Sequence, residues 1–279
     1  MNEPHSVRKQ FELTGRVAII TGGAGMLGVR YADAIAEMGG IPVLADMNIT
    51  SAEKSASELA AKYSGKSLGV EVDITNEAAV QTMVQKVMDE FGRIDILINN
   101  AAMTVKGGGG SFDNYFAAYE EYPRELFDMA MQINLTGAFL VTQAVGKVMV
   151  NQQSGVIVNV SSDVGTISPD HRLYKGMTYA GKPFNTPIAY SMSKAALLAM
   201  TRYLATYWAD KGIRVNSISP AGVFDDHEAD FVEKFSTLLP MARMAHKDEY
   251  KSAMLFLCSD ASSFMTGANL AIDGGRTAW

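Results

Sequence analysis

The chain of 279 residues is 48% hydrophobic and 19% charged, which is typical of a folded globular protein. Its net charge of −6 at pH 7, with no basic stripe, gives no support to a nucleic-acid or anionic-membrane partner. No run of 18 apolar residues predicts a membrane span, and residues 1–10 lack the apolar core of a signal peptide, so we expect a cytoplasmic protein. The single cysteine, Cys258, lies in an apolar run and is expected to be a buried, inert thiol.

Seven short runs rich in β-branched residues alternate with segments of helical periodicity. Several runs are apolar on both faces, as expected of parallel strands covered on each side. This alternation predicts an α/β fold with a doubly wound, parallel, seven-stranded sheet in a single domain covering residues 1–279. Pro42 is expected at the first residue of a strand, where its missing N–H is tolerated. The predicted strands are Val17–Thr21, Val43–Asp46, Leu68–Val72, Ile94–Asn99, Gly155–Val160, Arg214–Ile218 and Leu270–Asp273.

Three connections are longer than those usual in such folds: residues 103–121, 166–186 and 221–228. Each follows a predicted strand, so we expect all three to overhang the carboxyl edge of the sheet, where ligands of this fold class bind. The first two are predicted to be insertions at the active site.

A glycine-rich turn follows the first strand. Gly22, Gly25 and Gly28 permit a tight turn, close approach of a pyrophosphate and close helix packing. The following helix N-terminus adds unpaired N–H groups. Asp46 ends the second strand, 18 positions after Gly28 (46 − 28), where its carboxylate would accept hydrogen bonds from an adenosine ribose and repel a 2′-phosphate. The sequence therefore predicts a dinucleotide site that prefers NAD over NADP.

Tyr190 and Lys194 lie four residues apart and share one face of a predicted helix. A phenol has a pKa near 10, and an adjacent ammonium together with a cationic nicotinamide would lower it. The pair therefore predicts a general base for a hydroxyl proton. Tyr207 and Lys211 have the same spacing, but they lie late in the helix and are expected to be structural, with the aromatic ring buried and the lysine extended along the surface.

Taken together in chain order, these motifs resemble those of the short-chain dehydrogenase/reductase family over about residues 13–275. The further matches are Asn99-Asn-Ala-Ala102, Asn134-Leu-Thr-Gly137, Val158-Asn-Val-Ser-Ser162, Tyr190-x-x-x-Lys194, Asn216-Ser-Ile-Ser-Pro-Ala-Gly222 and Ile272-Asp-Gly-Gly275. The resemblance implies a Rossmann fold, a homotetramer or dimer, and a sugar-acid or polyol substrate of the kind used by members similar to gluconate 5-dehydrogenase. It also implies that the cofactor is held by Gly22, Gly25, Met26, Leu27, Gly28, Asp46, Asp73, Ile74, Asn100, Ala101, Tyr190, Lys194, Pro220 and Val223.

The resemblance further implies a catalytic set of four residues. Tyr190 exchanges the proton of the substrate oxygen, and Ser162 hydrogen-bonds that oxygen. Lys194 holds the nicotinamide ribose and lowers the pKa of the tyrosine, while Asn134 helps to hold a water that links the lysine to solvent. The protein supplies orientation and charge placement, and the cofactor supplies the hydride chemistry.

Three departures from the family pattern are present. Met26 stands where a glycine is usual, a spacing that resembles the extended branch with its sugar-nucleotide epimerases and dehydratases. Ala102 replaces a glycine. Ser162 and Tyr190 are about twice as far apart as in most members, so the 166–186 insertion must loop out if the two side chains are to meet.

The insertion that ends before Tyr190 is rich in hydrogen-bond donors and cations, and His171 and Arg172 are candidate substrate contacts. His227, between Asp226 and Glu228, is a weak metal signal because contiguous side chains seldom converge, and we expect no catalytic metal. A small hydroxylated substrate, a sugar, sugar acid or polyol, is favoured. The alternatives are a sugar epimerase or dehydratase with retained NAD, a non-catalytic NAD-binding sensor, and a reductase of ketones bound to an acyl carrier.

Overall fold

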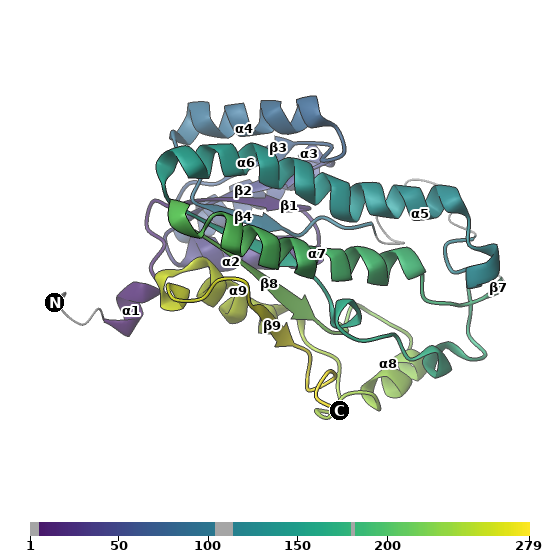
Figure 1. Ribbon diagram of the computed structural model, residues 1–279. Coiled ribbons are helices and arrows are strands. Elements are labelled where there is room, and N and C mark those ends of the chain that lie inside the picture. The colour runs from purple at the N-terminus through teal and green to yellow at the C-terminus, as the bar shows by residue number, and fades with distance from the viewer. Residues whose placement is uncertain (1–5, 104–113, 180–181) are drawn as a thin grey trace.

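The computed structural model describes residues 6–103, 114–179 and 182–279 and forms one α/β domain around a parallel sheet (Figure 1). The seven strands follow the order β3-β2-β1-β4-β5-β8-β9. The predicted doubly wound, seven-stranded sheet is therefore confirmed. Its strands are β1 (Val17–Thr21), β2 (Ile41–Asp46), β3 (Leu68–Glu71), β4 (Ile96–Asn99), β5 (Gly155–Val160), β8 (Ile213–Pro220) and β9 (Asn269–Ile272).

Alternation of side chains along each strand divides the apolar core into two layers. Val17 and Ile19 of β1 pack into one layer, and Ala18 and Ile20 pack into the other. The first layer is completed by α4 (Glu77–Phe91), α6 (Ala138–Gln152) and α7 (Ile188–Tyr207). The second is completed by α2 (Met26–Glu37), α3 (Ile49–Tyr63) and α9 (Lys251–Cys258), whose Cys258 is fully buried as predicted.

Local sequence explains where the covering helices begin and end. Asn48 caps α3 by accepting the N–H of Ser51, and Asn76 caps α4 by accepting the N–H of Ala79. Gly92 closes α4 with φ +71°, a left-handed conformation that glycine adopts without strain. The shorter helices are α1 (Val7–Gln10), α5 (Arg124–Met131) and α8 (Ala229–Ser236).

Pro42 occupies the second residue of β2 rather than the first, which corrects the prediction. The N–H of Ile41 donates to the carbonyl oxygen of Arg16 on the β1 side, so the next nitrogen along the strand faces β3. Pairing with β3 begins only at Val43. No strand pairing is lost at Pro42, because β3 offers no acceptor opposite the position where its N–H would lie.

One long helix, Arg124–Gln152, has the length and apolar composition of a membrane span. α5, the π-helical turn Gln132–Gly137 and α6 form a continuous helix of 29 residues, Arg124–Gln152, that is long and apolar enough to cross a bilayer. Half of its most apolar window is buried within the protein. Val141, Val145 and Met149 pack in the first core layer. We therefore assign it as a core helix of the α/β domain.

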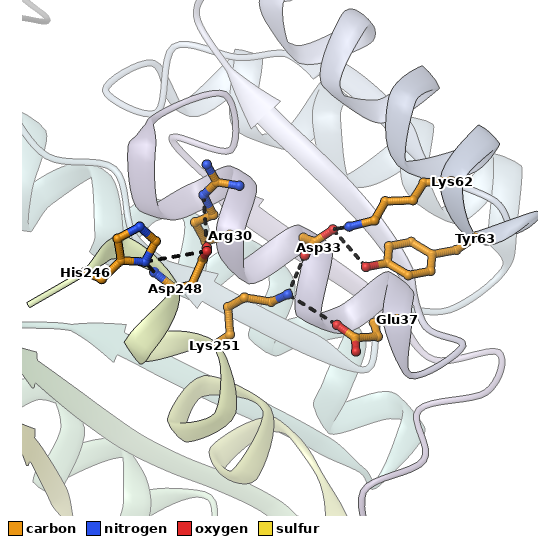
Figure 2. A network of polar contacts seen from close by, with 8 residues as sticks. All are labelled: Arg30, Asp33, Glu37, Lys62, Tyr63, His246, Asp248 and Lys251. Carbon is orange, nitrogen blue, oxygen red and sulfur yellow. Dashed lines mark hydrogen bonds and ion pairs between the residues drawn. The ribbon is translucent and has the colours of Figure 1, made fainter. Parts of the chain in front are cut away.

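A polar network ties α2 to α3 and α9 (Figure 2). The carboxylate of Asp33 accepts hydrogen bonds from Lys62, Tyr63 and Lys251. Burial alone would raise the pKa of Asp33, but these hydrogen bonds lower it to about 2. Arg30 of α2 pairs with Asp248 at 3.3 Å, just before α9. The helix that follows the glycine-rich turn is thus held by charge pairs on two sides.

The two insertions contact each other at the carboxyl edge of the sheet. The second contains a short hairpin of β6 (Thr178–Tyr179) and β7 (Lys182–Pro183), which the sequence analysis did not predict. Lys182 Nζ donates to Asn114 Oδ1 of the first insertion at 2.7 Å. The glycine-rich part of the first insertion, within residues 104–113, lies outside the described residues.

Aromatic rings join these insertions to α8, the helix that follows the third long connection. Phe116 stacks on Phe184 with a centroid separation of 3.9 Å, and Phe184 stacks on Tyr174 at 4.9 Å. Tyr174 continues the stack to Phe231 of α8 at 6.5 Å, and Phe231 to Phe235 at 5.7 Å. We call these five residues the aromatic stack. The two insertions and α8 therefore contact one another through aromatic rings, which the polar sequence of the loops did not indicate.

Candidate active site

The turn between β1 and α2 has the geometry of a phosphate cradle. Gly22 has φ +60°, and a Cβ placed on Gly28 would lie 2.2 Å from the carbonyl oxygen of Gly22. The absence of side chains at both positions therefore allows the helix to start against the turn. α2 begins at Met26 after Gly25, and no side chain caps it. Its first N–H groups fit an anionic diphosphate.

Asp46 lies beside this turn at the end of β2. Its Oδ2 accepts the N–H of Ala24 and its Oδ1 accepts the N–H of Asn48, both at 3.0 Å. A carboxylate oxygen has further acceptor capacity after one hydrogen bond. Asp46 is therefore placed to accept ribose hydroxyls from a nucleotide bound at the turn.

The end of β4 is anchored to the same turn. Asn100 Nδ2 donates to the carbonyl oxygens of Thr21 and Gly22, at 3.0 and 3.1 Å. The hydroxyl of Thr21 accepts the N–H groups of Asn100 and Ala101. Thr21 is not among the residues predicted from the sequence. The only indication of its role is that it is a polar residue at the end of an otherwise apolar strand. These bonds fix the spacing between two strand ends that border the cofactor position.

The remaining predicted cofactor residues lie along the same carboxyl edge. Asp73 Oδ1 accepts the N–H and the hydroxyl of Thr75, which shapes the turn after β3. Ile74 packs where a Cβ on Gly137 would stand, only 2.6 Å from its Cδ1. Pro220 ends β8, and Val223 forms a parallel bridge with Ala245.

The structure brings Ser162, Tyr190 and Lys194 together. Ser162 follows β5, and the other two lie in the first turns of α7. The hydroxyl of Ser162 lies close enough to Tyr190 to lower the pKa of that phenol, while its own hydrogen bond goes to Asp163. Lys194 Nζ lies 5.7 Å from the centre of the Tyr190 ring and donates to the carbonyl oxygen of Val160 at 2.7 Å. That bond uses one of the three ammonium donors and leaves two.

Burial shifts the pKa values of both Tyr190 and Lys194. Burial raises the pKa of Tyr190; the hydrogen bond with Ser162 lowers it, and the charge of Asp163 raises it. Burial also lowers the pKa of Lys194 to about 8. In the protein alone, burial is the largest effect on the Tyr190 pKa and Lys194 is not among its causes, so the expected lowering by Lys194 and a cationic nicotinamide stays a prediction for the cofactor-bound state.

Asn134 reaches the active-site helix through the π-helical turn. Its Oδ1 accepts the N–H of Met103 at 2.7 Å, and its Nδ2 donates to Ser193 Oγ at 3.1 Å. Ser193 Oγ in turn donates to the carbonyl oxygen of Tyr190 at 2.9 Å. Sequence reasoning missed Ser193 because a helix serine is usually a local backbone binder. The hydroxyl of Ser193 thus links Asn134 to the backbone of Tyr190, two of the predicted catalytic residues.

Asp163, immediately after Ser162, was also missed. It is buried, and its Oδ1 accepts the hydroxyl of Ser162 and the N–H of Val164, both at 2.8 Å. Burial raises its pKa, while the hydrogen bonds and the charge of Arg276 lower it. The only sequence signal was an acidic residue directly after a buried strand.

His171 and Arg172, the predicted substrate contacts, lie in a 3-10 turn, His171–Tyr174, with both residues exposed. The guanidinium of Arg172 pairs with Asp170 at 2.7 Å. Contact of His171 or Arg172 with substrate stays a prediction, and the Arg172 guanidinium is meanwhile engaged in this exposed pair. The ring nitrogen Nδ1 of His227 accepts the N–H of Asp225 at 3.1 Å. Among residues 6–103, 114–179 and 182–279, no group of three or more His, Cys, Asp or Glu side chains could hold a metal ion.

The competing pair, Tyr207 and Lys211, lies at the far end of α7. Tyr207 is 62% exposed, not buried as predicted, and stacks on Tyr203 with centroids 5.8 Å apart. Lys211 pairs with the neighbouring Asp210. A cavity of about 640 Å³ also lies away from Tyr190, among residues at the amino ends of β1, β4, β5 and β8. The candidate catalytic residues Ser162, Tyr190 and Lys194 therefore lie at the carboxyl edge of the sheet, away from this cavity.

Comparisons with known proteins agree with this geometry. The profile of the family described as "Enoyl-(Acyl carrier protein) reductase" matches residues 23–277. D-threitol dehydrogenase of Mycolicibacterium smegmatis is 35% identical over 98% of this chain and 96% of its own. The solved structures include a short-chain type dehydrogenase/reductase from Mycobacterium marinum, with 31% identity, a TM-score of 0.85 and coverage of 99% of this chain and 100% of that one.

A structure of NAD+-bound xylitol dehydrogenase matches with 31% identity and a TM-score of 0.82, over 94% of this chain and 99% of that one. The matched relatives include enzymes named for NAD and enzymes named for NADP. The ordered motifs, the sheet and these matches lead to one conclusion: the chain belongs to the short-chain dehydrogenase/reductase family and is a nicotinamide-dependent oxidoreductase of secondary alcohols and ketones.

Proposed function

We propose that this protein is an NAD-dependent polyol dehydrogenase, which interconverts a secondary carbinol and a ketone in a small polyhydroxylated substrate. The observation that carries this proposal is the convergence of Ser162, Tyr190 and Lys194 where β5 ends and α7 begins: the Ser162 hydroxyl lowers the pKa of Tyr190, and Lys194 Nζ lies 5.7 Å from the centre of the Tyr190 ring. The threitol and xylitol dehydrogenases among the relatives support the substrate class.

The protein groups divide the work of the reaction as follows. Tyr190 accepts the carbinol proton during oxidation and returns it during reduction. Ser162 orients the substrate oxygen toward the phenol. Lys194, held by Val160, directs its two remaining donors toward the ribose, and Asn134 and Ser193 hold the backbone of Tyr190 in place. When bound, the oxidised nicotinamide supplies the hydride acceptor and a positive charge that favours the phenolate.

NAD is the proposed cofactor rather than NADP. Asp46 presents a carboxylate beside the glycine-rich turn, where a 2′-phosphate would be repelled and a 2′-hydroxyl would be bound. The uncapped start of α2 and the glycines at positions 22 and 28 support the placement of the pyrophosphate. A clear NADP preference of the wild-type enzyme would overturn this assignment.

Net cofactor reduction is the decisive test of the reaction. We expect NADH to accumulate with threitol, xylitol, galactitol or glycerol, and far less with apolar secondary alcohols of similar size. An epimerase or dehydratase with retained NAD would convert a sugar without accumulating NADH, and a non-catalytic NAD sensor would bind NADH without turnover. Reduction of an acyl-carrier ketone, the activity nearest to the family description, predicts instead NADPH oxidation with 3-oxoacyl thioesters.

We also propose a homotetramer, or a dimer, acting in the cytoplasm without a catalytic metal. Apolar side chains are exposed on the two helices beside the site: Phe139 of α6 (49%) and Met192, Tyr203 and Tyr207 of α7 (47%, 66% and 62%). Burial of such side chains between copies would stabilise an assembly. Sedimentation velocity tests the assembly; loss of activity with a chelator and its return with a divalent ion would contradict the metal-free proposal.

A further inference from the structure

The carboxylate of Asp163 is buried beside the reacting groups, and the roles described above leave it without a task. It follows Ser162 directly, opens the 3-10 turn Asp163–Gly165 and is 6% exposed. Burial of a carboxylate is unfavourable unless its oxygens are paired, so its presence here calls for a reason. Arg276, in the C-terminal turn, supplies the opposite charge, whereas Asp273 opposes it.

Turn formation accounts for only one of the two oxygens. Oδ1 accepts both the Ser162 hydroxyl and the Val164 N–H, a capping role that a neutral serine or asparagine could fill. Within the described part of the chain, Oδ2 makes no hydrogen bond. It is also not among the side-chain atoms that are both fully enclosed and unpartnered, so it borders accessible space. One acceptor of a buried charge is therefore open.

The carboxylate of Asp163 acts electrostatically on two nearby tyrosines. The charge of Asp163 raises the pKa of Tyr190 in α7 and also that of Tyr174 in the aromatic stack. The charge of Asp163 therefore acts on the proposed general base and on the second insertion. Tyr115 also interacts with both Tyr190 and Tyr122, and the enclosed hydroxyl of Tyr122 has no partner among the described residues. The open oxygen of Asp163 is therefore an acceptor that lies near the proposed general base.

We propose that Asp163 determines specificity for vicinal diols: its Oδ2 accepts a hydrogen bond from the hydroxyl on the carbon next to the reacting carbinol. The reacting oxygen is shared by Ser162 and Tyr190, and Asp163 lies one hydrogen bond from Ser162. Neighbouring hydroxyls of a polyol lie about one hydrogen-bond length apart, so one substrate can reach both groups. This inference rests on the proposed polyol dehydrogenase function and identifies the residue that reads the second hydroxyl.

The reason for discrimination is the unpaired charge. A substrate that lacks the second hydroxyl would displace water from Oδ2 and leave a desolvated carboxylate without a donor, which costs far more than the loss of a neutral contact. The enzyme should therefore reject simple secondary alcohols that are smaller than its substrate and fit the site sterically.

The test compares 2,3-butanediol with 2-butanol, which share the reacting carbinol and differ in one adjacent hydroxyl. With NAD, we expect kcat/KM of the wild type to favour the diol by about 10²-fold or more. Asp163→Asn keeps one oxygen to accept from Ser162 and Val164, replaces Oδ2 by an amide NH2 donor and removes the negative charge. This variant should lower the ratio at least tenfold. Asp170→Asn is the matched control: it removes a carboxylate from the second insertion that pairs with the exposed Arg172, and the ratio should stay at the wild-type value.

The ratio cancels any loss of activity that both substrates share, including a change in the orientation of Ser162. A wild-type ratio near one overturns the role of Asp163 while NADH formation from polyols still supports the dehydrogenase, and this comparison needs no variant to fold. An unchanged ratio in Asp163→Asn also overturns it. Absence of NADH formation from any alcohol tested would overturn the proposed function and, with it, the inference that depends on it.

Discussion

Ser162 lies close enough to Tyr190 to lower the pKa of its phenol, although the second insertion separates the two residues along the chain. The insertion leaves the carboxyl end of β5 and returns at the start of α7, so its hairpin extends beyond the sheet without separating the two side chains (Figure 1). Lys182 and Phe184 of the insertion contact Asn114 and Phe116 instead. The insertion therefore enlarges the wall of the site and leaves its reacting centre at the sheet edge.

Tyr190→Phe should lower kcat/KM for polyol oxidation by about 10²–10⁴-fold, because the ring stays and only the proton-accepting oxygen is lost. NADH binding, followed by fluorescence titration, should change little. Tyr207→Phe is the matched control, since this tyrosine also precedes a lysine by four residues but is exposed at the end of α7. Full activity in Tyr190→Phe, or an equal loss in the control, would contradict the assignment of the base.

Replacement of Asp46 should shift cofactor preference. Asp46→Asn retains an oxygen to accept the N–H of Ala24 but removes the charge, whereas Asp46→Ala removes both. We expect the ratio of kcat/KM for NADP to that for NAD to rise about tenfold or more in both variants, equivalent to about 1.4 kcal/mol. If the ratio rises only in the alanine variant, turn geometry rather than charge sets the preference.

The activity should rise with pH as Tyr190 loses its proton, and Asp163→Asn should move this rise to lower pH. Burial raises the pKa of Tyr190, and the negative charge of Asp163 raises it further, so removal of that charge makes the phenolate easier to form. The measurement is kcat/KM for threitol between pH 6 and about pH 11, where ordinary tyrosine has titrated. A displacement toward higher pH would show that the carboxylate does not act on the phenol.

Asp33→Asn should destabilise the fold through the network that holds α2. Loss of the charge leaves Lys251 and Lys62 without their carboxylate, and we expect a loss of about 1–2 kcal/mol in the free energy of unfolding near pH 7. The Asp33 pKa is lowered to about 2 in the folded protein, so its contribution is present above the unfolded pKa near 4 and is lost as the pH falls through about 2. Urea unfolding at several pH values should therefore show the two proteins converging in acid; a constant difference down to pH 2 would argue against the charge as its source.

Much of the architecture could be predicted because its causes are local. Parallel strands buried on both faces leave continuous apolar runs, and all seven predicted runs correspond to strands with boundaries within a few residues. Because strand ends share one edge, Asp46 could be placed at the site before any contact was known, whereas the placement of Ser162 depended on the family resemblance.

The parts that could not be predicted depend on contacts between distant segments. Ser193 becomes important only because the π-helical turn brings Asn134 against it, and no local pattern announces one extra residue in a helical turn. The pairing of Arg172 with Asp170, two residues away, could not be predicted either, because it depends on how the loop turns. The hairpin of the second insertion is too short to leave a periodic signal.

The aromatic stack couples three stretches of chain that would otherwise vary independently. Each ring from Phe116 through Phe184 and Tyr174 to Phe231 rests on its neighbour, so lengthening any one stretch would break a contact belonging to another. Evolution of new substrate preference in this protein would consequently require matched changes on both insertions and α8, whereas single replacements at the sheet edge, such as at Asp163, could alter selectivity without disturbing that shared wall.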